Sequence, residues 1–153
     1  MLAQTIKRTW LPAIILSLLP LSYGCATPPD VASVIEVIDG DTIIIEGGYK
    51  VRYIGIDTPE IHTKVEAFGV EAREANRKLV EGKEVRLERD ISEKDKYGRL
   101  LRYVYVGPTF VNAELVSQGL ARARAYPPDT RYQHYLEQLE IEAREAGRGM
   151  WAK

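Results

Sequence analysis

Alternating apolar and polar positions predict three short strands in the chain after residue 30. The apolar, β-branched runs at 31–38, 41–46 and 49–56 each have the length and composition of a strand. An Asp-Gly dipeptide at 39–40 separates the first two runs, and Gly-Gly at 47–48 separates the second from the third. Both dipeptides favour tight turns between antiparallel strands. We therefore expect the three strands to form an antiparallel meander.

The rest of the chain adds two strands and three helices to this meander. Alternation returns at 83–90 and 99–106, which we predict to be strands. Asn112 opens a short segment of helical period, and asparagine is a favoured residue at a helix N-cap. Five strands, with helices after the third strand and near the end of the chain, fit a five-stranded OB-fold barrel, an α+β architecture. The predicted helices cover about 68–79, 112–119 and 130–146.

The first 25 residues differ from this globular pattern. Two basic residues, an uncharged apolar run over 10–23 and a glycine precede Cys25. This order is typical of a secretory signal. A membrane-spanning helix needs ~20 apolar residues, whereas this run is shorter and contains two prolines. We therefore predict that residues 1–25 are a signal peptide and that the protein is exported.

The segment around Cys25 makes the export prediction more specific. "LSYGC" resembles the bacterial lipoprotein cleavage motif, in which the cysteine is lipidated and becomes the new N-terminus. Residues 26–31 then form an extended tether to one domain over 32–153. The alternative is an ordinary signal, cut near Ala26. The first outcome predicts anchoring to the cell membrane or envelope by lipid at Cys25, and the second predicts secretion.

Composition and charge limit what the domain can be. The chain of 153 residues is long enough for one ordinary domain, and its single cysteine allows no internal disulfide. Residues 1–25 hold two of the 21 Lys and Arg and none of the 22 Asp and Glu, so the remaining chain has a net charge of −3. Dedicated nucleic-acid binders usually carry a strongly basic face. Any phosphate chemistry must therefore depend on local charge or on a metal ion. We also expect the protein to be a monomer.

Two aspartates are predicted to meet at one end of the meander. Asp41 begins the second strand and Asp57 ends the third, and antiparallel neighbours bring these positions together. Clustered carboxylates repel unless a cation lies between them, and oxygen ligands suit a hard cation such as Ca²⁺, to which the backbone carbonyl of Thr58 could contribute. An EF-hand loop is excluded, because its fifth position, counted from Asp39 as the first, is Ile43, which cannot bind a cation. The scarcity of cysteine and histidine argues against zinc.

Arginines and a further carboxylate complete the polar clusters. Arg52 lies five residues before Asp57, and an odd separation places two side chains on opposite faces of an ideal strand. A bend or a bulge near Gly55 would bring them to the same side, and the sequence leaves both arrangements open. Two guanidiniums, those of Arg52 and Arg99, could hold a phosphate group, while Glu60 acts as general base. The residue types therefore suit phosphodiester hydrolysis.

Three motifs in order, "VIDGDT", "RYIGIDTPE" and "DKYGR", resemble the staphylococcal (micrococcal) nuclease family over about 34–151. The resemblance implies an OB-fold and calcium-dependent endonucleolytic hydrolysis of DNA and RNA that leaves 3′-phosphates. It also implies roles for individual residues. These are Asp41, Asp57 and the carbonyl of Thr58 as calcium ligands; Arg52, Glu60 and Arg99 as catalytic residues; Asp39 as an acid near the metal; Lys96 and Tyr97 as phosphate contacts; and Tyr126 as a base-stacking residue.

Two other functions remain open at this point. An OB-fold can bind oligonucleotides without cutting them, which would make the protein a catalytically weak binding lipoprotein. The carboxylates could instead hold a purely structural calcium ion, although such a site has no need of paired arginines. The presence of all six candidate ligands and catalytic residues favours an enzyme. The segment "ARARAYPPDT" at 121–130 aligns ambiguously with the family.

Overall fold

The computed structural model describes residues 27–62 and 65–152. The predicted signal peptide 1–25, including Cys25, lies outside the described residues. Within the described ranges, no helix combines the length and the apolar character needed to cross a membrane. The first strand begins at Val31, the first residue of the predicted strand 31–38.

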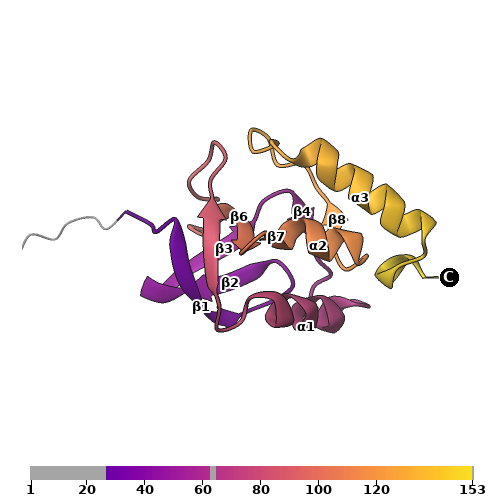
Figure 1. The fold of residues 1–153 in the computed structure, drawn as a ribbon, viewed down its shortest axis with the longest axis horizontal. Helices are drawn as coiled ribbons and strands as arrows, with labels where there is room; N and C mark the ends of the chain where they lie inside the picture. Colours follow the sequence, from indigo (N-terminus) through magenta and orange to yellow (C-terminus); the bar gives the residue numbers. More distant parts are fainter. Residues whose placement is uncertain (1–26, 63–64, 153) are drawn as a thin grey trace, which may run out of the picture.

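Five strands form a closed barrel (Figure 1). Antiparallel pairing joins the third strand to the second, the second to the first, the first to the fourth barrel strand, and the fourth to the fifth. A parallel pairing between the third and fifth barrel strands closes the ring. The predicted five-stranded OB-fold is therefore confirmed. The barrel strands are β1 (Val31–Val37), β2 (Thr42–Ile45), β3 (Tyr49–Tyr53), β5 (Glu84–Glu88) and β6 (Leu100–Val106).

Strand alternation fills the barrel interior. Ile43 and Ile45 of β2 are fully buried, and Ile43 pairs across the ladder with Val51 of β3, which is also fully buried. Lys50 of β3, at the alternate position, is exposed. Burying one face of each strand in this way removes apolar surface from water and fixes the register, because a one-residue slip would turn every apolar side chain outward. This register also fixes the ends of β2 and β3, where the polar cluster lies.

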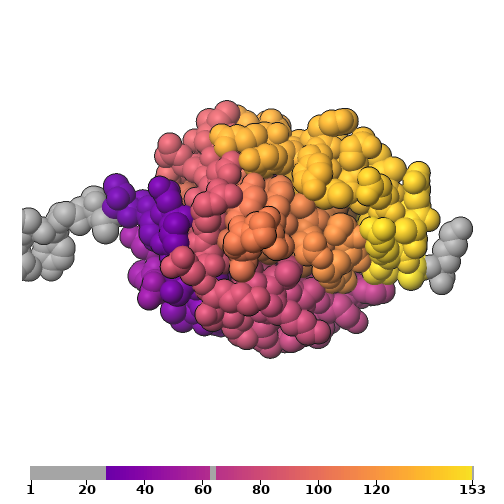
Figure 2. Space-filling view, viewed as in Figure 1, coloured from indigo at the N-terminus to yellow at the C-terminus, as the bar shows by residue number. Residues whose placement is uncertain are grey.

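Three helices pack around the barrel. They are α1 (Gly69–Val80), α2 (Val111–Ser117) and α3 (Gln133–Glu145), which matches the three predicted helices. Helix α2 packs between the barrel and α3, and α1 contacts β1 and α2. The last turn of the chain, η2 (Gly149–Trp151), follows α3. Figure 2 shows that α3 and this turn cover one end of the molecule, with the first described residues at the opposite end.

Two short connections complete the chain. A single 3₁₀ turn, η1 (Glu46–Gly48), links β2 to β3, and β7 (Thr109–Phe110) forms a short hairpin with β6 just before α2.

The C-terminal turn η2 lies close to the end of α2. Gly119 has φ +70°, and a Cβ at this position would lie 2.1 Å from the carbonyl oxygen of Arg148. Only glycine fits both the backbone conformation and the space.

The third predicted strand, 49–56, is not continuous. β3 ends at Tyr53, and Gly55, with φ +78°, turns the chain away from the barrel. The next two residues form β4 (Ile56–Asp57), which pairs with β8 (Arg122–Ala123) in a separate small sheet. Asp57 therefore does not end a barrel strand, as the sequence had predicted. It lies on β4 of this two-stranded sheet, where it pairs with Arg122.

The predicted cap at Asn112 is also wrong. Helix α2 begins at Val111, and Asn112 lies inside its first turn with its side chain fully buried. The side chain accepts a hydrogen bond from the N–H of Val104 over 3.0 Å and donates one to the carbonyl oxygen of Ile54 over 2.8 Å. Two buried backbone groups need partners at this position, and satisfying them outweighs the capping preference of asparagine.

Candidate active site

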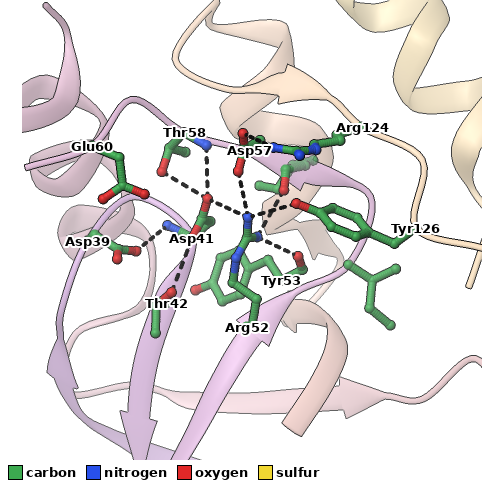
Figure 3. Close-up of polar contacts among 12 residues, drawn as sticks. Asp39, Asp41, Thr42, Arg52, Tyr53, Asp57, Thr58, Glu60, Arg124 and Tyr126 are labelled. Atoms are coloured by element: carbon green, nitrogen blue, oxygen red, sulfur yellow. Dashed lines mark hydrogen bonds and ion pairs between the residues drawn. The ribbon is translucent and has the colours of Figure 1, made fainter. Parts of the chain in front are cut away.

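One cavity of about 610 Å³ lies where β2 begins and the chain leaves β3. Figure 3 shows the polar contacts along one part of its wall. The cavity gathers residues from both ends of the domain sequence, including every site residue predicted by the family resemblance. These are Asp39, Asp41, Arg52, Asp57, Thr58, Glu60, Lys96, Tyr97, Arg99 and Tyr126.

Asp41 is a buried carboxylate held by three side chains or backbone groups. Its Oδ2 accepts hydrogen bonds from the N–H and the hydroxyl of Thr58, over 2.8 and 3.0 Å, and its Oδ1 accepts one from the Thr42 hydroxyl over 3.1 Å. Its own N–H donates to Asp39 Oδ1 over 3.0 Å, so the turn between β1 and β2 is fixed by its aspartates. Burial raises the pKa of Asp41 to about 6, although Arg52 and the Thr58 hydrogen bonds oppose this shift.

Arg52 is a buried guanidinium that joins the two aspartates. Its Nη1 donates to the carbonyl oxygens of Tyr53 and Ile56, over 2.8 and 2.9 Å. Its Nη2 lies 2.8 Å from Asp57 Oδ1 and 3.2 Å from Asp41 Oδ2. One edge of the guanidinium is therefore anchored to backbone, and the other edge faces oxygen anions. This is the planar arrangement in which arginine recognises carboxylate or phosphate.

The bend at Gly55 is what brings Arg52 and Asp57 together. The left-handed backbone of Gly55 reverses the chain within the turn after β3, so the odd spacing of the two residues no longer separates them. A Cβ at Gly55 would lie 2.7 Å from Leu136 Cδ1 of α3, so a larger residue would also clash with the helix. Of the two arrangements that the sequence leaves open, the structure contains the bend.

A second buried asparagine supports the other side of the site. Asn76 accepts a hydrogen bond from the Tyr53 hydroxyl over 2.9 Å and donates one to the carbonyl oxygen of Asp39 over 3.0 Å. It thereby ties α1 to the turn that carries the aspartates. Asn76 is not among the site residues predicted from the sequence. The signal was present, because a lone asparagine lies on the apolar face of α1 with Ala72 and Val80.

Glu60 is exposed and lines the cavity beyond Pro59. Its backbone is fixed, because its N–H donates to the Glu66 carboxylate over 3.1 Å and its carbonyl accepts from the Glu66 N–H over 2.9 Å. Figure 3 shows its side chain directed towards Asp39 and Asp41, away from Arg124. No dashed contact joins its carboxylate to the other residues drawn. Glu60 is thus a carboxylate held at the cavity by its backbone and left open to a water molecule.

A tight turn before β6 presents Arg99. Asp95 Oδ1 accepts the N–H groups of Tyr97 and Arg99, over 2.9 and 3.0 Å, and Asp95 Oδ2 accepts from Arg99 Nε over 2.7 Å. Burial alone would raise the pKa of Asp95, but these hydrogen bonds outweigh it and hold the pKa below its ordinary value. Both Lys96 and Arg99 approach the ring of the exposed Tyr97, at 5.0 and 5.5 Å from its centroid. The other guanidinium nitrogens of Arg99, Nη1 and Nη2, have no hydrogen-bond partner among the described residues.

Arg124 is a cavity residue that is not among those predicted from the sequence. It follows β8, and its Nη1 lies 2.7 Å from Asp57 Oδ2. The ring of Tyr126 lies near two guanidiniums, with its centroid 5.4 Å from Cζ of Arg124 and 5.8 Å from Cζ of Arg52. Burial raises the pKa of the Tyr126 hydroxyl. The alternation of Arg122 and Arg124 before Tyr126 was the available signal, but only the pairing of β8 with β4 places Arg124 beside Asp57.

The donor atoms of this cavity fit a hard cation. Asp39, Asp41, Asp57 and Glu60 offer only oxygen, which suits Ca²⁺. The raised pKa of Asp41 means that Arg52 and the hydrogen bonds do not fully offset the cost of burying its negative charge. A bound cation would stabilise this charge. Across the part of the chain that the structure describes, no three acidic, histidine or cysteine side chains are already gathered into a metal centre. Thr58 directs its N–H and hydroxyl at Asp41, so a role for its carbonyl as a ligand stays a prediction.

Sequence comparisons place this site among known proteins. A family model described as staphylococcal nuclease homologue matches residues 50–153. A thermonuclease of Staphylococcus hyicus is 42% identical over 125 residues, which are 78% of this chain and 74% of that protein. Endonuclease YncB of Bacillus subtilis is 42% identical over 126 residues, 77% of this chain and 60% of that protein.

A more distant similarity covers almost all of the sequence. An uncharacterized endonuclease of Haemophilus influenzae is 34% identical over 152 residues, which are 96% of this chain and 80% of that protein. The matched family model includes the segment that carries Arg52, Asp57, Glu60 and Arg99. The fold, the order of the motifs and these similarities agree, and the chain belongs to the staphylococcal nuclease family.

Proposed function

We propose that this protein is a calcium-dependent nuclease that cuts DNA and RNA internally and leaves 3′-phosphates. The observation that carries the proposal is the composition of one cavity. It contains two linked aspartates, two anchored arginines and a glutamate without a partner in the cavity wall. Membership of the staphylococcal nuclease family supports it, as do relatives named thermonuclease and endonuclease.

The arginines supply the phosphate-binding part of the mechanism. Arg99 is held by Nε alone, which leaves Nη1 and Nη2 for two phosphate oxygens. Arg52 is anchored through Nη1 to backbone carbonyls and presents Nη2 to anionic oxygens. Because both groups are fixed before substrate arrives, they need little reorganisation to stabilise the charge that builds on the phosphate in the transition state.

Glu60 supplies the general base. A water molecule gives its proton to the Glu60 carboxylate while its oxygen bonds to phosphorus. The bond from phosphorus to the 5′ oxygen then breaks, and that oxygen leaves with the bonding electrons and takes up a proton. Calcium, when bound by Asp41 and Asp57, would neutralise phosphate charge and help to position the water. The backbone anchoring of Glu60 by Glu66 keeps the base at the cavity during these steps.

We infer the site of action from the N-terminal segment. The basic, apolar and small-residue order of residues 1–25 supports export, and "LSYGC" supports anchoring by lipid at Cys25 rather than release into the medium. A single acyl chain anchors a protein weakly, so stable attachment needs a modification with several chains. The folded domain would then act as a monomer outside the cytoplasm on nucleic acids that reach the cell surface.

A plasmid-nicking assay tests the proposal. Purified protein is incubated with supercoiled DNA, and separately with RNA, in CaCl₂, in MgCl₂ or in excess EGTA. We expect internal cuts with 3′-phosphate ends in CaCl₂, slow cutting in MgCl₂ because Mg²⁺ demands tighter octahedral geometry, and none in EGTA. Binding of the nucleic acid without cutting in CaCl₂ would instead identify an OB-fold binding protein.

A further inference from the structure

Both carboxylate oxygens of Asp57 are already paired with arginines. Arg52 Nη2 lies 2.8 Å from Oδ1, and Arg124 Nη1 lies 2.7 Å from Oδ2. Figure 3 shows the two guanidiniums reaching the carboxylate from different directions. A cation bound by Asp57 would meet a positive charge at either oxygen. Repulsion between the positive charges therefore favours the withdrawal of one of the two arginines when Asp57 serves as a cation ligand.

Arg124 is the arginine that can withdraw. The Arg52 side chain is 10% exposed and is tied to two backbone carbonyls, so its movement would leave buried polar groups unpaired. The Arg124 side chain is 58% exposed, and Asp57 is its only hydrogen-bond partner among the described residues. Water can replace that single contact at little cost, because exposed ion pairs contribute little to stability.

The released guanidinium stays beside the substrate. Arg124 lines the same cavity as Arg52, Arg99 and Glu60. Its backbone cannot drift, because its N–H donates to the carbonyl oxygen of Gly55 over 2.9 Å. The free side chain carries a planar fork of donors at the mouth of a site that binds phosphates, which is the group that this fork matches best.

We propose that Arg124 is a substrate-binding residue that exchanges Asp57 for a phosphate oxygen of the nucleic-acid strand when the cation occupies the site. The inference rests on the proposed function. It predicts that removal of the Arg124 side chain changes the affinities for the cation and for the nucleic acid in opposite directions. Without Arg124, the cation no longer competes for Asp57 and binds more tightly, whereas the nucleic acid loses a phosphate contact and binds less tightly.

Calorimetry of Arg124→Ala tests the first prediction without reference to activity. CaCl₂ alone is titrated into cation-free wild type and variant. We expect calcium to bind about two- to fivefold more tightly to Arg124→Ala, the range set by one exposed ion pair. Arg131→Ala is the matched control, because Arg131 forms a similar pair with Glu88 at 2.7 Å, is 46% exposed and lies outside the cavity. Its calcium affinity should equal that of wild type.

Kinetics on a single-stranded oligodeoxynucleotide test the second prediction. The KM of Arg124→Ala should rise by about three- to tenfold with little change in kcat, which is the range for the loss of one ordinary hydrogen bond at an exposed position. The slope of log KM against log salt should fall by about 0.7, the value for one phosphate contact with a single strand. Arg124→Lys keeps the charge without the fork, so its KM should lie between those of wild type and Arg124→Ala.

Several results would overturn the inference. Equal calcium affinity in wild type and Arg124→Ala would show that Arg124 does not compete for Asp57. An equal gain in Arg131→Ala would show a general effect of charge. An unchanged KM would rule out the phosphate contact. Failure of wild type itself to bind calcium would instead remove the calcium dependence on which the proposed function depends, and the exchange with it.

Discussion

Asn112 Nδ2 donates a hydrogen bond to the carbonyl oxygen of Ile54 over 2.8 Å, and this contact holds the turn on which the site depends. The turn leads from β3 through Gly55 to Asp57, and its direction decides whether Asp57 reaches Arg52. Because the same side chain also accepts the N–H of Val104, one residue of α2 connects the turn to barrel strand β6. The geometry of the aspartate cluster therefore depends on hydrogen bonds that a buried residue of α2 makes in the core of the domain.

Asn112→Ala should be strongly destabilising. It leaves the N–H of Val104 and the carbonyl of Ile54 without partners in a buried region, and each unpaired group costs about 1–3 kcal/mol. We expect the free energy of unfolding, measured by urea denaturation, to fall by about 2–4 kcal/mol. Gln138→Ala, on the exposed side of α3, is the control and should change it by less than about 0.5 kcal/mol. Equal effects of the two substitutions would refute the proposed support.

Asp41 should make the cation-free protein less stable at neutral pH. Burial raises its pKa from 3.8 to about 6, so between these values the folded protein holds a proton that the unfolded chain has lost. The resulting penalty is fully present above about pH 6 and disappears as the pH falls towards 4. Its size follows from a shift of about two units and is at most about 3 kcal/mol.

Urea denaturation in EGTA, with wild type and Asp41→Asn, measures this penalty. The variant should be about 1–3 kcal/mol more stable than wild type near neutral pH, and the difference should shrink towards about pH 5. Added calcium should stabilise wild type and leave Asp41→Asn unaffected, because the variant has lost a ligand charge. A difference in stability that does not vary with pH would show that the Asp41 carboxyl is not perturbed by burial.

Arg99→Lys should lower kcat and leave KM nearly unchanged. Lysine keeps the charge but lacks the planar fork that can hold two phosphate oxygens. Loss of one preorganised donor typically lowers the rate by ~10²–10³-fold. Arg52→Lys should show the same kinetic pattern together with lower stability, because lysine cannot keep both backbone carbonyls and both aspartates as partners.

A matched control separates this effect from general loss of arginine. Arg86 lies over the ring of Tyr105, 3.9 Å from its centroid and outside the cavity, so Arg86→Lys should leave kcat unchanged. Near-normal kcat for Arg99→Lys or Arg52→Lys would mean that the guanidiniums only collect substrate. In that case the damage would appear in KM and would grow with salt.

Cys25→Ala should abolish fatty-acid labelling of the protein in bacterial cells. The prediction depends on the motif "LSYGC", in which Cys25 is the modified residue. Labelled fatty acid is fed to cells that express wild type or the variant, and the purified chains are compared. A shorter protein that starts near Ala26 should keep its nuclease activity, because β1 begins only at Val31. Equal labelling of both chains, or labelling of neither, would reject the lipid anchor.

The strand pattern predicted the barrel, and the motifs with their family resemblance named most of the polar residues of its cavity, but neither predicted Arg124 or how Asp57 reaches Arg52. The alternating segments have a strand period of two, which places their apolar residues inside whichever way the strands pair. Gly55 is equally compatible with a bulge and with a bend, since both use a left-handed glycine. Only the packing of the turn against Leu136 and Asn112 selects the bend.

The supporting residues show a second limit. Asn112 was interpreted as a helix cap because capping depends on neighbours in sequence, whereas its actual partners, Val104 and Ile54, lie eight and 58 residues away. Asn76 and Arg124 act through contacts that are also distant in sequence, 37 residues to Asp39 and 67 residues to Asp57. The local sequence marks Asn76 and Arg124 as unusual, but only the three-dimensional structure shows their partners.

The rate at which Glu60→Gln cuts single-stranded DNA in CaCl₂ tests the account most directly. Glutamine keeps the size of the side chain but cannot accept a proton from water, and a general base contributes typically 10²–10⁴-fold to rate, so we predict a fall in kcat of about that size. Stability should stay at the wild-type value, because Figure 3 draws no hydrogen bond or ion pair to the Glu60 side chain. Glu71→Gln, an exposed substitution on α1, should cut at the wild-type rate. Wild-type kcat in Glu60→Gln would contradict the account.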